Sequence, residues 1–356
     1  MSKALKGNFF EDFSLGQTLV HGTPRTVGEG DQALYIALTG SRQVLPSART
    51  VAHALGYPDR PLDDLLAFHL AFGKTVADIS LNAVANLGYA DVRFLAPVYV
   101  GDTLKAESTI IGLRENSNGK AGIVWVRSTA VNQNEQEVLS WIRWVMVHKG
   151  DASRPAPTPV VPELPPMVEP HRLGIPACLD ARGYEPEVSG GPWLWEDYGI
   201  GERIDHPAGM TLEESDHTLA TRLYQNSARL HFDAFLMAHT PFGRRLVYGG
   251  HVISICRALS FEGLENALTI AAINGGVHSN PTFAGDTLYA WSEVLDKWEL
   301  FERDDLGALR LRLVGVKNMP PGELAEAKPQ EAGGKYHPNV VLDLDYTVLM
   351  PRRSGP

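Results

Sequence analysis

Cysteine is scarce in this sequence, and long apolar runs are missing. The 356 residues include two cysteines, Cys178 and Cys256, with no CxxC pair and no cluster of cysteine and histidine at zinc-ligand spacing. This argues against a disulfide framework and against a metal site, and it fits a protein of the reducing cytoplasm. The first residues lack the apolar stretch of a signal peptide, and no apolar run could cross a bilayer. We therefore expect a cytoplasmic protein that binds no metal and has no membrane partner.

An excess of positive charge is also missing. The formal net charge is −10, and no basic run with interleaved aromatic residues occurs, so nucleic acid is not an expected partner. The sequences GxGxxG, Walker A and GxSxG are absent as well, which argues against nucleotide-dependent enzymes and serine hydrolases. Hydrophobic residues at 44% and charged residues at 21% are typical of a globular chain. The length leaves room for two domains.

The chain repeats itself at an offset of about 185 residues. The matching segments, in order, are Phe10–Phe13 with Trp195–Tyr198, Glu29–Asp31 with Glu214–Asp216, Asn82–Ala83 with Asn266–Ala267, and Gly101–Leu104 with Gly285–Leu288. Such a period is too long for a solenoid repeat and indicates a duplicated domain.

A proline-rich segment separates the two copies. Seven prolines lie from Pro155 to Pro170, where few residues could hold a helix or an inner strand. The composition predicts a semi-extended linker that runs over the surface, outside both domains. We place the first domain at 1–150, the linker at 151–191 and the second domain at 192–350.

Each copy has the same predicted order of elements. An extended segment and a short helix behind an acidic cap precede an apolar helix, at 65–79 in the first copy and 251–260 in the second. Three alternating strands close each copy, at 103–113, 123–131 and 138–147 and at 288–295, 309–316 and 340–349. One long helix against an antiparallel sheet is an α+β design. A helix wrapped by a strongly curved sheet is the hot-dog arrangement. We predict two tandem hot-dog domains, packed as an internal pseudo-dimer whose two sheets stay separate.

His231 is the strongest candidate for acid/base chemistry, because imidazole titrates near neutral pH. At the repeat offset the first copy has Ser41 in place of Asn226 and Pro46 in place of His231. In duplicated enzymes one copy often carries the chemistry while the other completes the cleft. We therefore expect the catalytic site in the second domain.

Tyr248-Gly249-Gly250-His251 opens the apolar helix of the second copy. Two glycines at a helix start allow close backbone approach, and the free amides suit a thioester oxygen that gains negative charge in the transition state. A plain loop-to-helix turn is the alternative. The nearby arginines Arg229, Arg244 and Arg245 suit a substrate carboxylate or a phosphate of coenzyme A.

At these residues the sequence resembles a known family, the MaoC-like or hydratase-2-type hot-dog dehydratases, and within it the mesaconyl-CoA hydratases. The resemblance is carried by Gly7–Phe13, Ile79–Ala83, Leu223–Asn226, Gly243–Arg245, Tyr248–His251, Phe283–Thr287 and Asp345–Arg353. It implies a hydro-lyase that reversibly hydrates mesaconyl-CoA (2-methylfumaryl-CoA) to β-methylmalyl-CoA. It implies no cofactor, since coenzyme A belongs to the substrate, and a homo-oligomer.

The family uses an aspartate and, five residues later, a histidine as its acid/base pair. Here the histidine is His231, but the aspartate position holds Asn226, which cannot take a proton although it can orient a water. The resemblance leaves three alternatives: His231 titrates alone, Asp233 supplies the second group, or the substrate's own carboxylate does. It further implies that amides at Gly249, Gly250 and His251 hold the enolate oxygen. Arg229 would pair with the free carboxylate, while Arg244, Arg245 and Tyr248 would contact the substrate or coenzyme A.

Two other functions are open to a hot-dog protein. A thioesterase would bind the same class of ligand and use a helix carboxylate, for which Asp63, Asp64 and Asp78 are available. A non-catalytic acyl-CoA binding protein would need an effector domain, and no residues are left over for one.

Overall fold

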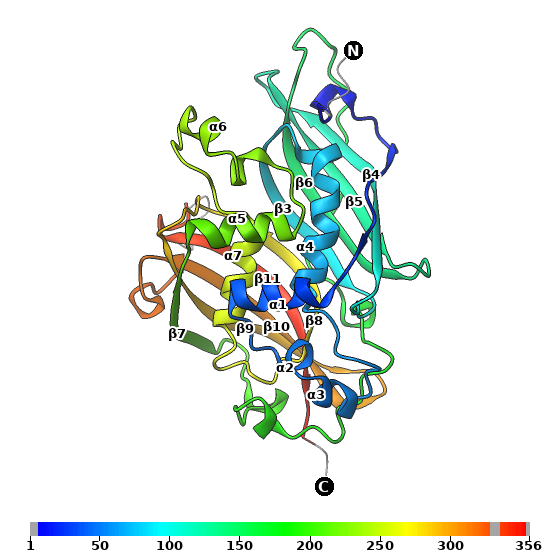
Figure 1. Ribbon diagram of the computed structural model, residues 1–356, viewed down its shortest axis with the longest axis vertical. Coiled ribbons are helices and arrows are strands. Elements are labelled where there is room, and N and C mark those ends of the chain that lie inside the picture. The colour runs from blue at the N-terminus through cyan, green and yellow to red at the C-terminus, as the bar shows by residue number, and fades with distance from the viewer. Residues whose placement is uncertain (1–5, 328–334, 354–356) are drawn as a thin grey trace.

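The computed structural model describes residues 6–327 and 335–353. It has two halves, each with a long helix wrapped by antiparallel strands. Figure 1 shows the cyan strands of the first half above and the orange and red strands of the second half below. No helix among the described residues is long and apolar enough to span a bilayer.

The first half contains the predicted helix and strands. Its helices are α1 (Glu29–Thr39), α2 (Val44–Ser47), α3 (Arg49–Ala54) and α4 (Asp64–Thr75), which continues as a π-helical turn over Val76–Ser80. Its strands are β1 (Thr18–Val20), β2 (Arg25–Thr26), β3 (Ala83–Phe94), β4 (Thr103–Glu115), β5 (Ala121–Val131) and β6 (Glu137–His148). Every residue of α4 after Asp64 is buried, because the helix is apolar on all sides and lies inside the curve of the sheet.

The second half repeats this order. It consists of β7 (Arg203–Thr211), α5 (Glu214–Leu223), α6 (Ala234–Ala238), α7 (Gly249–Leu259), β8 (Thr269–Val277), β9 (Thr287–Leu300), β10 (Arg303–Lys317) and β11 (Val340–Pro351). Buried contacts repeat as well: His21 Nε2 lies 2.7 Å from Ser108 Oγ, and His206 Nε2 lies 2.8 Å from Ser292 Oγ. The two halves therefore share equivalent side-chain contacts as well as the sequence repeat.

Two strands that the sequence analysis did not predict join the halves. β3 and β8 pair antiparallel, with Tyr89 opposite Gly276 and Val92 opposite Ile273. The strand order is β1-β4-β5-β6-β3-β8-β11-β10-β9-β7, with β2 beside β4. The expectation of two separate sheets is thus wrong. β3 and β8 are the edges of their own halves, and each satisfies the backbone groups that the other leaves unpaired.

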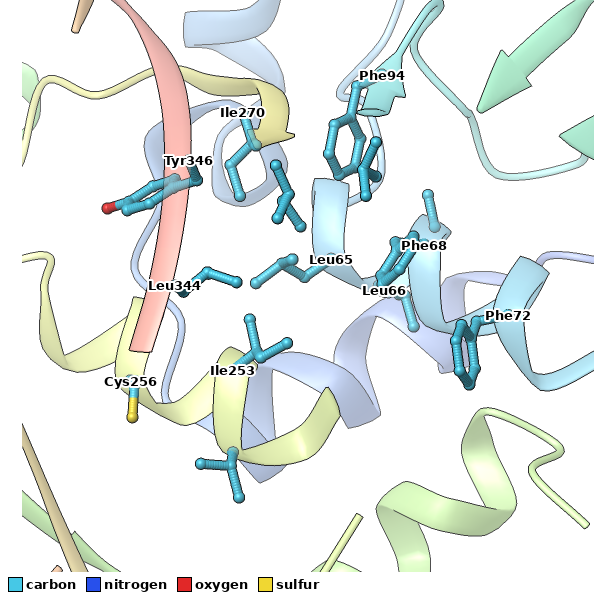
Figure 2. Close-up of a cluster of buried hydrophobic side chains, with 14 of the residues drawn as sticks. Leu65, Leu66, Phe68, Phe72, Phe94, Ile253, Cys256, Ile270, Leu344 and Tyr346 are labelled. Carbon is cyan, nitrogen blue, oxygen red and sulfur yellow. The ribbon is translucent and has the colours of Figure 1, made fainter. Parts of the chain in front are cut away.

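The core continues across the junction. Figure 2 shows Phe68 and Phe72 of α4, Ile253 of α7 and Leu344 of β11 in one buried cluster. The two central helices also meet through a hydrogen bond, since His69 Nε2 lies 3.0 Å from Ser254 Oγ at the equivalent place in the repeat. The halves form a pseudo-dimer with one shared interior.

The linker runs along both halves and includes short 3-10 turns at Pro170–Arg172 and Pro186–Val188. Its first part is mostly exposed, but Val160 exchanges two backbone hydrogen bonds with Leu113 of β4. From Val168 onward it packs on the second half, where Val168 N donates to Asn274 Oδ1 at 2.9 Å. Val168, Leu173 and Leu179 are buried in a second core cluster. The expectation of a linker outside both domains is therefore wrong for this part, because its apolar residues cover sheet surface that would otherwise face water.

Candidate active site

The candidate site forms where the turn before α6, the start of α7 and the end of β8 meet. His231 ends a 3-10 turn over Arg229–His231, and its ring centroid lies 5.5 Å from that of Tyr248, which precedes α7. His278 follows β8 and lies against the helix start, since a Cβ on Gly249 would be 2.6 Å from its ring. Two imidazoles thus flank the first turn of α7.

His231 is held as a neutral base. Its Nδ1 donates to the carbonyl oxygen of Leu246 at 3.0 Å, which leaves the lone pair on Nε2. Burial lowers the pKa of His231 to about 4, and charge on His217 or His278 lowers it further. Nε2 has no hydrogen-bond partner in the part of the chain that the structure describes. The ring can therefore accept a proton at neutral pH.

Asn226 and Asp233, on either side of His231 in sequence, are differently placed. Asn226 is buried, and its Oδ1 accepts the backbone N–H of Ala228 at 3.0 Å, so its amide nitrogen is the group left to orient a water. Asp233 caps α6 by accepting the N–H of Leu236 at 2.9 Å. Among the described residues no hydrogen bond joins Asp233 to His231. Asp233 is therefore engaged in a helix cap, whereas the amide nitrogen of Asn226 is not used in the hydrogen bond to Ala228.

The start of α7 offers two free backbone donors. Gly249 and Gly250 are the first two helical residues, whose N–H groups have no partner inside a helix. The N–H of His251 already donates to the carbonyl oxygen of Tyr248 at 2.9 Å. Burial lowers the pKa of the His251 side chain to about 4. The amides suited to an enolate oxygen are therefore those of the two glycines.

The three predicted arginines are on the surface side of the site. Arg229 and Arg244 are exposed, and the Arg244 guanidinium lies 4.1 Å from the ring centroid of Phe283. Arg245 forms an ion pair with Glu214. Arg244 stays available for a coenzyme A phosphate, whereas Arg245 already has an anionic partner.

His278 is a residue of the candidate site that the sequence analysis did not predict. Its Nε2 lies 3.5 Å from the hydroxyl of Tyr89 on β3, so both halves contribute to its surroundings. Burial lowers the pKa of His278 to about 4. In the sequence it follows Gly275-Gly276-Val277 without a motif, and only the pairing of β3 with β8 brings it to the site.

The equivalent place in the first half contains a small cavity. Its helix α4 begins at Asp64 behind the cap Asp63, where α7 has Gly249 behind Tyr248. Pro46, Asp63, Asp64 and Arg257 are among the residues around a cavity of about 20 Å³, which is room for little more than one water.

The carboxylates considered for a thioesterase are all engaged. Asp63 accepts from Ser41 Oγ at 3.0 Å, Asp64 accepts from the N–H of Ile270 at 2.7 Å, and Asp78 Oδ2 lies 2.8 Å from His21 Nδ1. In residues 6–327 and 335–353 no three histidine, cysteine, aspartate or glutamate side chains are placed to hold a metal ion.

Comparison with known proteins gives the family. The profile of the mesaconyl-CoA hydratase family matches residues 2–155. A β-methylmalyl-CoA dehydratase of Chloroflexus aurantiacus is 56% identical over 99% of both chains. A mesaconyl-CoA hydratase of Cereibacter sphaeroides is 55% identical over 98% of this chain and 100% of its own. This chain belongs to the mesaconyl-CoA hydratase family.

Solved structures agree with this family. A MaoC domain dehydratase structure from Chloroflexus aurantiacus is 56% identical, with a TM-score of 0.95 over 99% of this chain and 100% of the other. A Mycobacterium tuberculosis protein with a double hot-dog fold is 24% identical, with a TM-score of 0.72 over 97% and 99%. The predicted α+β double hot-dog fold is confirmed. Membership of the mesaconyl-CoA hydratase family also confirms the resemblance to MaoC-like dehydratases.

Proposed function

We propose that this chain is a hydro-lyase that reversibly hydrates mesaconyl-CoA to β-methylmalyl-CoA, with its site in the second half. The proposal rests on one observation above the others: a buried, neutral His231 with an open Nε2 lies beside the free amides of α7. Its relatives at 55–56% identity are named for the two directions of this reaction.

In the mechanism, water adds to Cβ of the enoyl thioester. His231 Nε2 takes a proton from a water that Asn226 orients, and the resulting hydroxide bonds to Cβ. The π electrons move to the thioester oxygen, where the N–H groups of Gly249 and Gly250 stabilise the enolate. A proton then passes to Cα. His278, across Gly249 from the reacting region, is the best-placed second acid/base group, because Asp233 is committed to its helix cap.

The decisive assay mixes the protein with mesaconyl-CoA and a free-thiol reagent. Loss of enoyl absorbance without thiol release identifies a hydratase. Thiol release would instead identify a thioesterase, and binding without either change an acyl-CoA binding protein. A cytoplasmic location and a homo-oligomer stay predictions; sedimentation that shows only a 38.9 kDa species would contradict the second.

A further inference from the structure

One arginine near the candidate site is more deeply buried than the three that the sequence analysis predicted. Arg143 of β6 is 1% exposed. Its guanidinium donates to Thr75 Oγ1 at 2.9 Å and to Ser80 Oγ at 3.3 Å, and its Nε has no partner among the described residues. No carboxylate of those residues forms an ion pair with it. A buried cation held by neutral hydroxyls alone lacks the counter-ion that burial ordinarily requires.

Arg143 is connected to the candidate site through aromatic side chains. Its guanidinium lies 4.3 Å from the ring centroid of Phe72, and that ring lies 6.1 Å from the ring of Tyr248. On the sheet Arg143 is directly opposite Tyr89, whose hydroxyl approaches His278. The Tyr248 hydroxyl is buried and unpartnered within the described part of the chain. Arg143 and Tyr248, each with an unsatisfied polar atom, thus both lie near the ring of Phe72.

The other half of the molecule has a comparable buried arginine, Arg257. Arg257 is the ninth residue of α7, as Phe72 is the ninth of α4, and it lies 6.0 Å from the ring of Tyr346, the counterpart of Arg143 on β11. The arginine and the aromatic ring have therefore exchanged places between the halves. There Arg257 donates to Gln43 Oε1 at 3.0 Å and to the carbonyl oxygen of Ala267 at 3.3 Å, and Asp63 and Asp64 line the same cavity.

We propose that Arg143 binds the free carboxylate of the substrate and so separates dicarboxylic from monocarboxylic enoyl thioesters. This rests on the proposed function. The carboxylate of mesaconyl-CoA is attached to Cβ, at the end of the acyl chain farthest from coenzyme A. In this proposal the thioester oxygen is at the glycine amides and the far end of the acyl chain is directed toward Phe72 and Arg143. Arg229, the partner expected from the sequence, is exposed, whereas Arg143 is buried.

The test compares Arg143→Met with the wild type on mesaconyl-CoA and on crotonyl-CoA, which has a methyl group in place of the carboxylate and no methyl group on Cα. We expect kcat/KM for mesaconyl-CoA to fall on the order of a hundredfold or more, as for one broken buried charge pair, with crotonyl-CoA spared. Arg143→Lys, which keeps the charge, should recover part of the loss. An equal loss for both substrates, or a selective loss in Arg229→Gln with none in Arg143→Met, would overturn the proposal.

Binding of unreactive thioesters gives a readout that needs no catalysis. Wild-type protein should bind succinyl-CoA more tightly than butyryl-CoA, and Arg143→Met should reverse that order, as measured by titration calorimetry. The matched variant Arg257→Met should change both affinities alike. If Arg143→Met does not fold, the wild-type pair decides, since equal affinities would reject the proposal. Preferential succinyl-CoA binding without hydration would reject the proposed reaction but keep the role of Arg143.

Discussion

At the scale of single residues, His231 carries the largest expected effect. Replacing it with alanine removes the proposed base, an imidazole whose Nδ1 donates to the carbonyl oxygen of Leu246. We therefore expect kcat to fall by roughly a hundredfold to ten-thousandfold. Affinity for butyryl-CoA should change little, because a base acts on the barrier more than on ground-state binding. His239→Ala is the control, since His239 is exposed on the neighbouring turn. Full activity of His231→Ala would reject the site.

The pH dependence of kcat/KM tests the environment of the same ring. In the proposed mechanism the neutral imidazole is the active form, and burial lowers the pKa of His231 to about 4. Activity should therefore hold from neutral pH down to about pH 5 and fall only near pH 4, rather than near the ordinary value of 6.5. Asn226→Asp keeps the acceptor for Ala228 N–H and adds a negative charge, which should raise the midpoint. A midpoint near 6.5 in the wild type would contradict the buried, neutral His231.

Residue identity could be read from the sequence only where the signal is local. His231, Gly249 and Gly250 were predicted because a five-residue spacing and a helix start lie within one stretch of chain. His278, Tyr89 and Arg143, which we propose for the site, were not predicted, because strand pairing brings each of them near the candidate site. The hydrophobic pattern of one strand does not show which residues of a distant strand will lie opposite it.

At the scale of elements, the start of α7 tolerates no added side chain. A Cβ on Gly250 would be 2.4 Å from the Tyr248 ring and 2.6 Å from the His69 ring, both buried, whereas a Cβ on Gly249 would meet only the half-buried His278. Gly250→Ala should therefore lower the free energy of unfolding by about 1–3 kcal/mol. Gly249→Ala should fold normally and lose activity as His278 moves.

Thermal unfolding and steady-state kinetics measure both effects. Gly30→Ala serves as the control, because its Cβ would meet nothing within 4 Å in the exposed first turn of α1. It should leave activity and stability close to those of the wild type. A Gly250→Ala protein as stable as this control would contradict the close packing at the helix start.

The central helices and three strands of each half were predicted because their apolar patterns are long. β3 and β8 were not, since glycines and asparagines interrupt them: Asn86 and Gly88 in β3, and Asn274, Gly275 and Gly276 in β8. Glycine is ordinarily unfavourable in a strand interior. Here Gly88 is required by the approach of the Trp144 ring, which would be 2.3 Å from a Cβ.

At the scale of the whole molecule, buried histidines make stability depend on pH. Burial lowers the pKa of His206, His231, His251 and His278 to about 4 and that of His69 to about 3. Below about pH 6.5 the unfolded chain takes up protons on these residues and the folded chain does not, so the free energy of unfolding should fall from pH 6.5 to about 4. Urea unfolding at pH 7.5 and 5.5 measures the loss. His251→Leu should lower the number of protons taken up on unfolding by about one. A urea midpoint of the wild type that does not change with pH would contradict the prediction.

The two crevices also set how many ligands one chain can hold. A pair of identical hot-dog subunits presents both crevices alike, so that every useful residue appears twice. A single chain has no such constraint, and here the place lined by Pro46 and Asp63 has a cavity of only about 20 Å³. Calorimetric titration with succinyl-CoA should therefore saturate at one molecule per chain, whatever the assembly size. A stoichiometry of two would mean that the first half also opens to bind the ligand. The two halves would then differ in their affinity for succinyl-CoA and not in whether they bind it.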